Sequence, residues 1–299
     1  MVDSQARASS LQWNVIDDVS ALANATQRKA WPLDDEAVHA FQRDGVCYLP
    51  GAFVDWVEPL RAGLERVIAS PDEFAFTSDS AEPGEPGRFF DTYCNWQRVP
   101  EFSTFALTSA AASIAAQCMR SATAQFFHEH AFVKEPGTQK ATPWHHDLPY
   151  YCVDGSQTAS VYVALDDTPV DTAVRFLAGS HRDGNTYVPR RFRTGNDYDY
   201  DDPSMVSAPK FDDNDEDASE QVAARALSAG DAIVFDFRTL HGTTAAPVAT
   251  RRRAFSTRWI GDDVRYVERR GVTSPPLDLD LQPGDRMPES LFPTLWSEA

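Results

Sequence analysis

The run Gln125–Val133, QFFHEHAFV, is where the sequence changes from a helical to a β-rich character. Turn residues separate it from four further runs rich in residues that favour strands: Ser160–Leu165, Val174–Ala178, Ala232–Phe237 and Ala254–Ile260. Short runs bounded by turn signals are typical of strands in a sandwich or a barrel. The second half of the chain therefore predicts an antiparallel β structure of that kind.

The first half of the chain has the periodicity of helices. Residues 1–30 are polar and rich in Ala and Ser, which predicts a loosely held arm before a single domain over 31–299. Between them, the chain predicts a strand at Val46–Leu49 and irregular structure over 70–100. Apolar spacing and capping residues predict three helices: Leu33–Asp44, Trp56–Ala69 and Phe105–Met119. Helices followed by many short strands indicate an α+β protein.

The composition restricts the class of protein. The chain has 299 residues, of which 42% are hydrophobic, so it can form a full-sized core. No run approaches the roughly 18 consecutive apolar residues of a transmembrane helix, and the first residues lack the pattern of a signal peptide. The four cysteines are scattered without CxxC spacing, which is typical of free thiols in a reducing compartment. We expect a cytoplasmic protein.

The net charge of −18 is partly local. Between Asn196 and Glu220 there are ten acidic residues and one Lys, within an insert over 195–222 that is rich in Asp, Asn and Pro. Loops of this length are commonly lids, binding loops or disordered segments. We expect either a lid-like segment or a solvated surface loop. Because phosphate contacts need clustered cations, the charge argues against nucleic acid and anionic membranes as partners.

Two histidines stand beside a carboxylate in Trp144-His145-His146-Asp147. On an extended strand, His145 and Asp147 would project to the same face. One more His from a distant strand would complete a facial triad of two His and one carboxylate, which leaves metal positions open for ligands. His241, which follows the apolar run Ala232–Phe237, is the candidate. An isolated His-x-Asp pair is more often structural than metal-binding, so a third element is needed.

That third element is Arg252, eleven residues after His241 in the run Arg251-Arg252-Arg253. A buried Arg near an iron triad can hold the distal carboxylate of a dicarboxylate through a bidentate pair. Alternation along a strand turns Arg252 away from both of its neighbours. Only one of the two faces can serve a cavity, and the other is expected to be solvated or to pair with acidic residues.

Taken in order, these segments resemble the phytanoyl-CoA dioxygenase family of Fe(II)/2-oxoglutarate-dependent oxygenases. The resemblance rests on Phe41–Val46, Lys134–Thr138, Trp144–Asp147, Ala164–Asp167, Gly179–His181, Gly230-Asp231, His241-Gly242 and Arg252. It implies a double-stranded β-helix (jelly roll, cupin-like) core with N-terminal and flanking helices. It also implies Fe(II) as the cofactor, with 2-oxoglutarate and O2 as cosubstrates.

The resemblance assigns roles to individual residues. His145, Asp147 and His241 would bind iron. Arg252 would pair with the C5 carboxylate of 2-oxoglutarate, assisted by the hydroxyl of Thr243.

Two further residues would line the cosubstrate pocket. Tyr162 would form one wall, and His130, a weaker candidate, would face the cosubstrate. His146 would point away from the iron and serve a structural role.

The reaction implied is oxidation of a small organic metabolite, of the kind found in secondary-metabolite biosynthesis, with succinate and CO2 as coproducts. Related halogenases lack the carboxylate that Asp147 supplies here, so hydroxylation or desaturation is expected. Besides the small-molecule substrate, a homodimer is the partner considered. Arg258 lies on the same strand face as Arg252, where it would either form a structural salt bridge or anchor an acidic substrate.

Three alternatives stay open. The first is an acyl-CoA hydroxylase, for which Arg190-Arg191-Arg193 is the only dense basic cluster outside the run Arg251–Arg253. The second is a jelly-roll binding protein with a vestigial metal site. The third is a metal-dependent isomerase or cleaving dioxygenase of the cupin type, which would bind iron and ignore 2-oxoglutarate.

Overall fold

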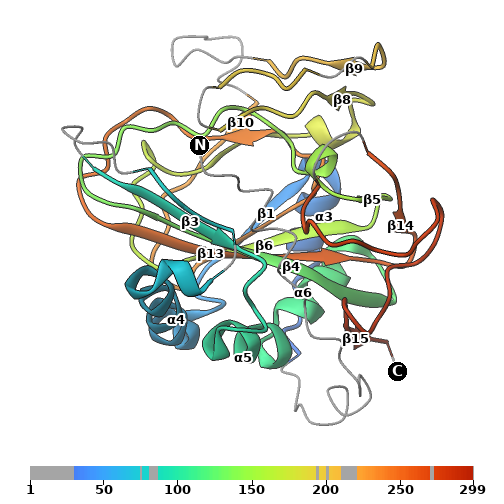
Figure 1. The fold of residues 1–299 in the computed structure, drawn as a ribbon, viewed down its shortest axis with the longest axis horizontal. Helices are drawn as coiled ribbons and strands as arrows, with labels where there is room; N and C mark the ends of the chain where they lie inside the picture. Colours follow the sequence, from blue (N-terminus) through green and yellow to red (C-terminus); the bar gives the residue numbers. More distant parts are fainter. Residues whose placement is uncertain are drawn as a thin grey trace.

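The centre of the protein is a large antiparallel sheet whose inner face is covered by a smaller one (Figure 1). The computed structural model describes residues 30–74, 76–80, 87–192, 195–199, 202–209, 221–269 and 273–298. Within these, the large sheet has eight strands in the order β1-β11-β6-β13-β4-β3-β2, with β15 also paired to β4. Its strands are β1 (Val46–Leu49), β2 (Thr77–Asp79), β3 (Phe89–Tyr93), β4 (Thr123–Lys134), β6 (Thr158–Ala164), β11 (Ala232–Phe235), β13 (Arg252–Ile260) and β15 (Thr294–Ser297).

The smaller sheet has the order β10-β7-β12. Its strands are β7 (Arg175–Leu177), β10 (Val222–Ala223) and β12 (His241–Gly242). The two sheets share a core in which Phe176 of β7 lies 5.1 Å from Phe235 of β11, measured between ring centroids. Two strand pairs lie outside these sheets: β5 (Val153–Asp154) with β14 (Arg265–Tyr266), and β8 (Thr186–Tyr187) with β9 (Met205–Val206). The arrangement confirms the predicted α+β jelly roll.

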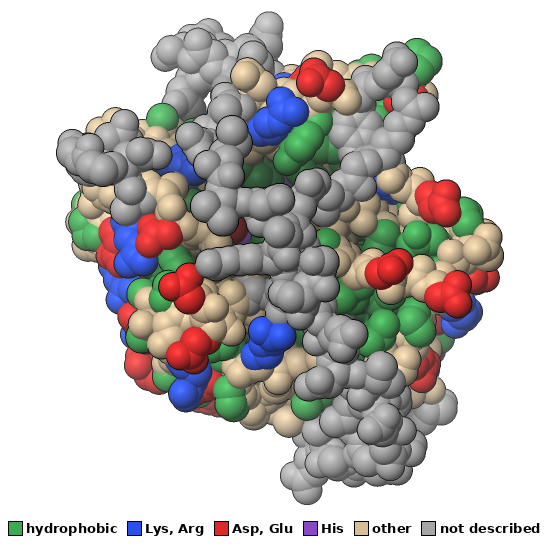
Figure 2. All heavy atoms as spheres, in the orientation of Figure 1, with side chains coloured by type: hydrophobic (Ala, Val, Ile, Leu, Met, Phe, Trp, Pro, Cys, Tyr) green, Lys and Arg blue, Asp and Glu red, His purple; other side chains and the backbone are tan. Residues whose placement is uncertain are grey.

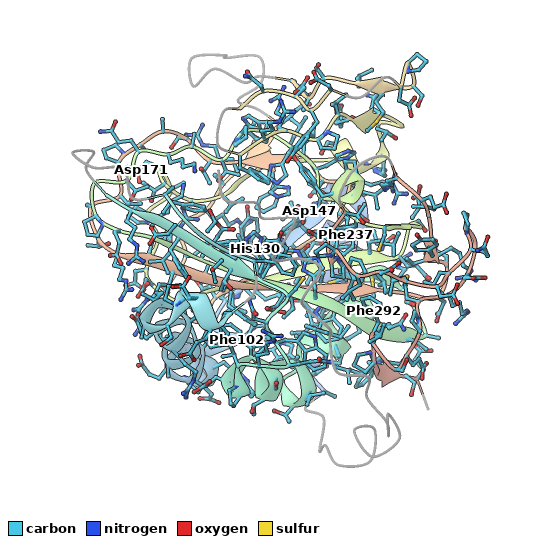
Figure 3. The ribbon with its side chains drawn as sticks, in the orientation of Figure 1. Phe102, His130, Asp147, Asp171, Phe237 and Phe292 are labelled. Carbon is cyan, nitrogen blue, oxygen red and sulfur yellow. The ribbon has the colours of Figure 1, made fainter. Side chains whose placement is uncertain are left out.

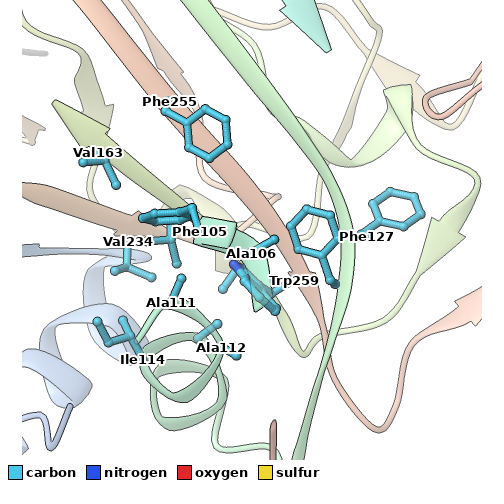
Figure 4. Packing of buried hydrophobic residues seen from close by; sticks show 14 of the residues in the cluster. Phe105, Ala106, Ala111, Ala112, Ile114, Phe127, Val163, Val234, Phe255 and Trp259 are labelled. Carbon is cyan, nitrogen blue, oxygen red and sulfur yellow. The ribbon is translucent and has the colours of Figure 1, made fainter. Parts of the chain in front are cut away.

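Helices cover the outer face of the large sheet (Figure 1). The helices are α3 (Asp35–Asp44), α4 (Val57–Ala69), α5 (Pro100–Thr108) and α6 (Ala111–Met119). Phe102 and Phe105 of α5 pack on Phe255 of β13, with ring centroids 4.6 and 5.3 Å from that of Phe255. Figure 4 shows Phe105 and Phe255 in this layer. This aromatic contact is the centre of the layer between helices and sheet.

Alternation along β13 separates the core from the site. Phe255 and Trp259 point toward the helices and are fully buried. Arg252, Ser256 and Arg258 have the opposite parity and point toward the small sheet. The prediction that Arg252 faces away from its neighbours is therefore confirmed.

The start of the domain follows its local sequence closely. The carboxylate of Asp34 accepts a hydrogen bond from the backbone N–H of Ala37 at 2.7 Å, which caps α3. Gly45 ends the helix with φ +76, and a Cβ there would lie 2.3 Å from the hydroxyl of Thr239. The chain can therefore turn directly into β1, as predicted.

Two sequence predictions were wrong. The single helix expected over Phe105–Met119 is two helices bent by 49°. The break occurs because Ser109 adopts an extended conformation and its hydroxyl accepts a hydrogen bond from Ala111 at 3.3 Å. Residues 70–100 are also not wholly irregular, because β2 and β3 lie within them. Pairing with β4 supplies the hydrogen bonds of β3, and the local sequence carries no sign of that partner.

Two other predictions concern segments that the structure describes incompletely. The polar arm lies outside the described residues except for residue 30. The acidic insert over 195–222 is described at 195–199, 202–209 and 221–222, where it contains β9 and the start of β10. Its role as a lid-like segment stays a prediction.

No single helix in the described parts of the chain is long and apolar enough to cross a membrane. The bent pair of α5 and α6 meets the length and composition criteria only when the two are taken together.

Replacing Phe255 with Ala should destabilise the fold strongly. The ring is fully buried between two aromatic rings, and removal of a buried Phe side chain costs about 3–5 kcal/mol. Urea unfolding followed by circular dichroism measures this loss. Val54→Ala, at a residue 58% exposed, is the control and should change stability by less than about 0.5 kcal/mol. A Phe255→Ala protein within about 1 kcal/mol of the wild type would contradict the packing described.

Candidate metal and cosubstrate site

Backbone pairing brings two distant segments together at the site. His145 and His241 exchange both backbone hydrogen bonds, at 3.0 and 2.8 Å. The N–H of Thr243 donates to the carbonyl of Thr142 at 2.9 Å and continues the ladder. At Gly242, a Cβ would lie 2.9 Å from that same carbonyl oxygen, so only glycine allows this approach. The two segments are thus held in a single register.

The three predicted metal ligands meet at one point. Asp147 Oδ1 lies 3.6 Å from His145 Nε2 and 3.8 Å from His241 Nε2. One ligand atom from each residue lies within 4.8 Å of the others, and all three residues are buried. The prediction that His145 and Asp147 share an extended strand was wrong. Asp147 has helical backbone angles, φ −73 and ψ −34, and precedes a 3-10 turn over Leu148–Tyr150, which brings its carboxylate back toward both imidazoles.

Both imidazoles are fixed in the tautomer that a metal needs. Nδ1 of His145 donates to the carbonyl of Pro143 at 2.8 Å, and Nδ1 of His241 donates to the carbonyl of Thr239 at 2.9 Å. Each Nε2 therefore carries its lone pair toward Asp147. Burial, assisted by the neighbouring His145, lowers the pKa of His241 to about 3, so this ring is neutral at neutral pH. Neutral imidazole is the form that ligates metals.

Asp147 is held by its second oxygen. Oδ2 accepts hydrogen bonds from the guanidinium of Arg258 and the hydroxyl of Ser160, both at 3.4 Å. Arg258 is itself positioned by Tyr151, whose hydroxyl accepts from Nε at 3.0 Å. Burial alone would raise the pKa of Asp147, but Arg258 and the two histidines outweigh it and hold the pKa well below its usual range. Arg258 thus forms the structural salt bridge that was one of its two predicted roles.

Two cations lie at one end of the inner face. Arg252 of β13 and Lys134 of β4 are directly opposite each other in the strand register. Arg252 donates to the hydroxyl of Tyr162 at 3.1 Å and to the carbonyl of Thr172. Lys134 donates to the hydroxyl of Thr243 at 3.3 Å. Burial, with Arg252 and Lys140 adding to it, lowers the pKa of Lys134 to about 7.

Neither cation has a carboxylate partner in the part of the chain that the structure describes. Arg252 is only 8% exposed. Burial of a charge without a counterion is costly, so this end of the cavity is suited to an anion.

The spacing of the site matches a dicarboxylate that also reaches the metal. Thr243 follows His241 by two residues on the paired segment, a separation of about 7 Å in an extended chain. Lys134, which donates to the hydroxyl of Thr243, therefore lies at a distance from the triad that suits a five-carbon diacid. Between Arg252 and Arg258 on β13, the hydroxyl of Ser256 is buried and has no hydrogen-bond partner. An unsatisfied buried donor on this path indicates a place for ligand oxygen.

The other residues considered in the sequence analysis, Tyr162, His130 and His146, have different contacts in the structure. Tyr162 positions Arg252 through its hydroxyl. His130, labelled near Asp147 in Figure 3, lies opposite Ser256 in the strand register and therefore on the inner face, where its Nε2 is hydrogen-bonded with the carboxylate of Asp91 at 3.2 Å. His146 points away from the triad and accepts a hydrogen bond from the backbone N–H of Tyr187 at 3.0 Å, as expected of a structural residue.

Sequence reasoning missed two residues of the site. Lys134 was noted only as part of a motif, and Ser256 was not singled out. A signal existed for Lys134, because it shares the parity of His130 on β4 and therefore faces inward. Ser256 gave no signal, since an isolated serine in a strand is ordinary.

The comparison with known proteins agrees with this geometry. The family model of phytanoyl-CoA dioxygenase matches residues 41–254. The chain belongs to the phytanoyl-CoA dioxygenase family. This membership confirms the predicted enzyme class, a non-haem iron oxygenase that depends on 2-oxoglutarate. No curated protein sequence matches the chain significantly.

Solved structures share the fold. The carbocyclase SnoK from nogalamycin biosynthesis has a TM-score of 0.65 and 22% identity, over 88% of this chain and 96% of its own. The epimerase SnoN, in complex with Fe3+, α-ketoglutarate and nogalamycin RO, has a TM-score of 0.64 and 19% identity, over 87% and 98%. EvdO2 from Micromonospora carbonacea var. aurantiaca, in complex with 2-oxoglutarate, has a TM-score of 0.56 and 23% identity, over 85% and 100%.

The two adjacent histidines should respond differently to substitution. His145→Ala removes one of three ligand atoms, so we expect the affinity for Fe(II), measured anaerobically by equilibrium dialysis, to fall by more than about 100-fold. His146→Gln keeps an acceptor for Tyr187 and should change the affinity by less than about tenfold. Equal losses in both variants would contradict the assignment.

Affinity for 2-oxoglutarate should decrease as the pH rises above 7. Lys134 has a pKa of about 7 without ligand, and a dicarboxylate favours its protonated form, so binding takes up a proton. We expect Kd to rise by at most about tenfold per pH unit between pH 7 and 9. Calorimetry of metal-loaded protein in two buffers of different ionisation enthalpy measures both Kd and proton uptake. The Lys134→Met variant should bind more weakly and without this pH dependence, and a wild-type Kd that is flat over the range would refute the role of Lys134.

Proposed function

We propose that the protein is an Fe(II)/2-oxoglutarate-dependent dioxygenase that hydroxylates or desaturates a small organic metabolite in natural-product biosynthesis. The proposal depends mainly on Arg252 and Lys134, two neighbouring cations without a carboxylate partner among the described residues. They lie near three residues, His145, Asp147 and His241, that could hold a metal ion. The triad alone would suit many metal proteins, whereas an anion pocket at this distance suits 2-oxoglutarate. Membership of the family and the natural-product setting of SnoK and SnoN support the same conclusion.

The residues divide the work of such a reaction. His145, Asp147 and His241 would hold the iron, and Arg252, Lys134 and Thr243 would hold the far carboxylate of 2-oxoglutarate. Bound iron would supply the activation of O2, with one oxygen atom entering succinate as CO2 is lost. The other atom would enter the substrate on hydroxylation or leave as water on desaturation.

The protein's own contribution is orientation and exclusion of water. Carbonyl contacts fix both imidazoles, while Arg258 and Ser160 fix the carboxylate of Asp147. Preorganised ligands need little reorganisation during the reaction. The fixed carboxylate also occupies the position that a halide would need, which favours hydroxylation or desaturation over halogenation.

A small metabolite fits the described surface better than an acyl-CoA does. Arg190 is buried and paired with Asp197 at 3.0 Å, and Arg191 lies 4.0 Å from Asp199. Arg193 lies outside the described residues. On the face drawn in Figure 2, the described Lys and Arg side chains are scattered among acidic ones. Arg190 is therefore matched within the fold, and Arg191 alone does not form a basic patch for the phosphates of coenzyme A.

The two alternatives of other classes are less consistent with the site. In a jelly-roll binding protein with a vestigial metal site, nothing would require both imidazoles to be held in the metal-binding tautomer, as they are here. A cupin-type isomerase or cleaving dioxygenase has no need for Arg252 and Lys134 beside the triad.

Arg252→Ala should impair turnover of 2-oxoglutarate specifically. Removing one partner of a buried charge pair costs about 2–5 kcal/mol, so the KM for 2-oxoglutarate should rise by at least about thirtyfold. The assay is succinate formation from 2-oxoglutarate with Fe(II) and ascorbate. Arg251→Ala is the matched control, because that neighbour faces outward and pairs with Glu65 at 2.6 Å. If the wild type forms no succinate, or if both variants behave alike, the proposal is wrong.

A further inference from the structure

A segment that runs from the last residue of β8 through β9 is hydrogen-bonded to the stretch that carries His145 and Asp147, called here the metal-binding stretch. We call residues 187–192, 195–199 and 202–209 the covering segment. Its first residue, Tyr187, donates its backbone N–H to Nε2 of His146 at 3.0 Å. Tyr150, three residues after Asp147, donates its hydroxyl to the carbonyl of Arg190 at 2.8 Å and accepts from the N–H of Arg190 at 2.5 Å. The position of the covering segment is therefore set by residues next to the triad.

Arg190 ties the covering segment together from within. Its side chain is 3% exposed and donates to the carbonyl of Trp144 at 3.2 Å. It also donates to Asp197 at 3.0 Å and to the carbonyl of Ala208. These contacts join the metal-binding stretch to both limbs of the covering segment. The residue two positions later, Phe192, is consequently held in place.

Phe192 presents an open aromatic ring beside the metal site. Its ring centroid lies 4.7 Å from that of His145 at an interplanar angle of 85°, and 5.6 Å from that of Tyr150 at 19°. Although it touches a buried triad residue, Phe192 is 41% exposed. A large apolar ring left open at this position is the feature expected of a binding wall rather than of a core.

A second group of aromatic rings lies next to His130 on the inner face of the large sheet. Phe76 and Tyr93 stack at 4.9 Å with an angle of 21°, and the ring of Tyr93 lies 5.5 Å from that of His130 on the inner face. Burial raises the pKa of both Tyr93 and Tyr150, and the nearby hydroxyl of Tyr198 adds to each shift. Three separate parts of the chain thus contribute rings.

We propose that the substrate is a flat, unsaturated ring system that stacks on the open side of Phe192, whose ring is already stacked with that of Tyr150 and lies against His145. This inference rests on the proposed function, because it places the ring beside the triad that would hold the iron. Aromatic faces attract other aromatic faces in offset or edge contacts more strongly than they attract saturated groups. A flat ring on Phe192 would lie against His145 and so bring its substituents to the metal.

The charges of the covering segment agree with an uncharged ring system. Arg190 is buried and paired with Asp197, whereas Arg191 is half-exposed and lies 4.7 Å over the ring of Tyr198. The described part of this segment therefore offers aromatic surface rather than free positive charge. An anionic substrate would find little to neutralise it here.

The test compares an aromatic probe with its saturated counterpart. Protein loaded with Mn(II) and 2-oxoglutarate is titrated by calorimetry with 2-naphthol and with trans-decahydro-2-naphthol. We expect the wild type to prefer 2-naphthol by about tenfold, and Phe192→Ala to reduce that preference to less than about threefold. Phe192→Trp should retain the preference. Val170→Ala, which removes an apolar side chain 51% exposed outside the covering segment, is the control and should behave as the wild type.

Proton NMR provides a second readout, which shows whether the probe binds near the metal. Bound Mn(II) broadens the proton resonances of nearby molecules, so the signals of 2-naphthol should broaden in the wild type and in Val170→Ala but not in Phe192→Ala. Equal binding of the two probes by the wild type, or an unchanged preference in Phe192→Ala, would overturn the inference. Calorimetry with 2-oxoglutarate alone distinguishes a failure of this substrate inference from a failure of the proposed function. Phe192→Ala should bind 2-oxoglutarate as the wild type does, whereas a wild type that does not bind it contradicts the proposed function instead.

Discussion

The antiparallel pairing of His145 with His241 is the constraint on which the site depends. These residues are far apart in sequence, and their two reciprocal backbone hydrogen bonds place both imidazoles on one side of the same ladder. The pairing also fixes Thr243, because the ladder continues to Thr142. Metal ligands and anion pocket therefore share one register, and a shift by one residue would turn both away from the cavity. Gly242 makes the close approach possible.

Much of this arrangement follows from the sequence. The alternation of Arg251, Arg252 and Arg253 predicted that Arg252 faces away from both neighbours, and the structure confirms it; the resemblance indicated that Arg252 is the one that faces the cavity. The capped helix before Gly45 and the long strand around Gln125–Val133 were also predicted, because their signals are local. The triad was assembled from motif and resemblance, and its three residues do come together. In each case, residue type and spacing carried the information.

What could not be predicted depends on contacts between distant segments. The strand β3 forms because it pairs with β4, and the residues of β3 themselves do not indicate that partner. The break at Ser109 is a competition between a side-chain hydroxyl and the helix backbone, which periodicity does not detect. Asp147 reaches the two imidazoles through a helical turn rather than an extended strand, so the predicted proximity was right and the predicted route to it was wrong. The role of Lys134 required knowledge of its neighbour across the sheet.

His145 and His146 are consecutive residues that face opposite ways. The first contributes to the triad, and the second holds the backbone of Tyr187 at the start of the covering segment. One side chain of this dipeptide thus belongs to the triad, and the other sets the position of the covering segment. Because the anchoring contact uses the backbone N–H of Tyr187, it does not depend on the side chain at that position. Side chains of the covering segment can therefore be replaced without altering the contacts that hold the triad together.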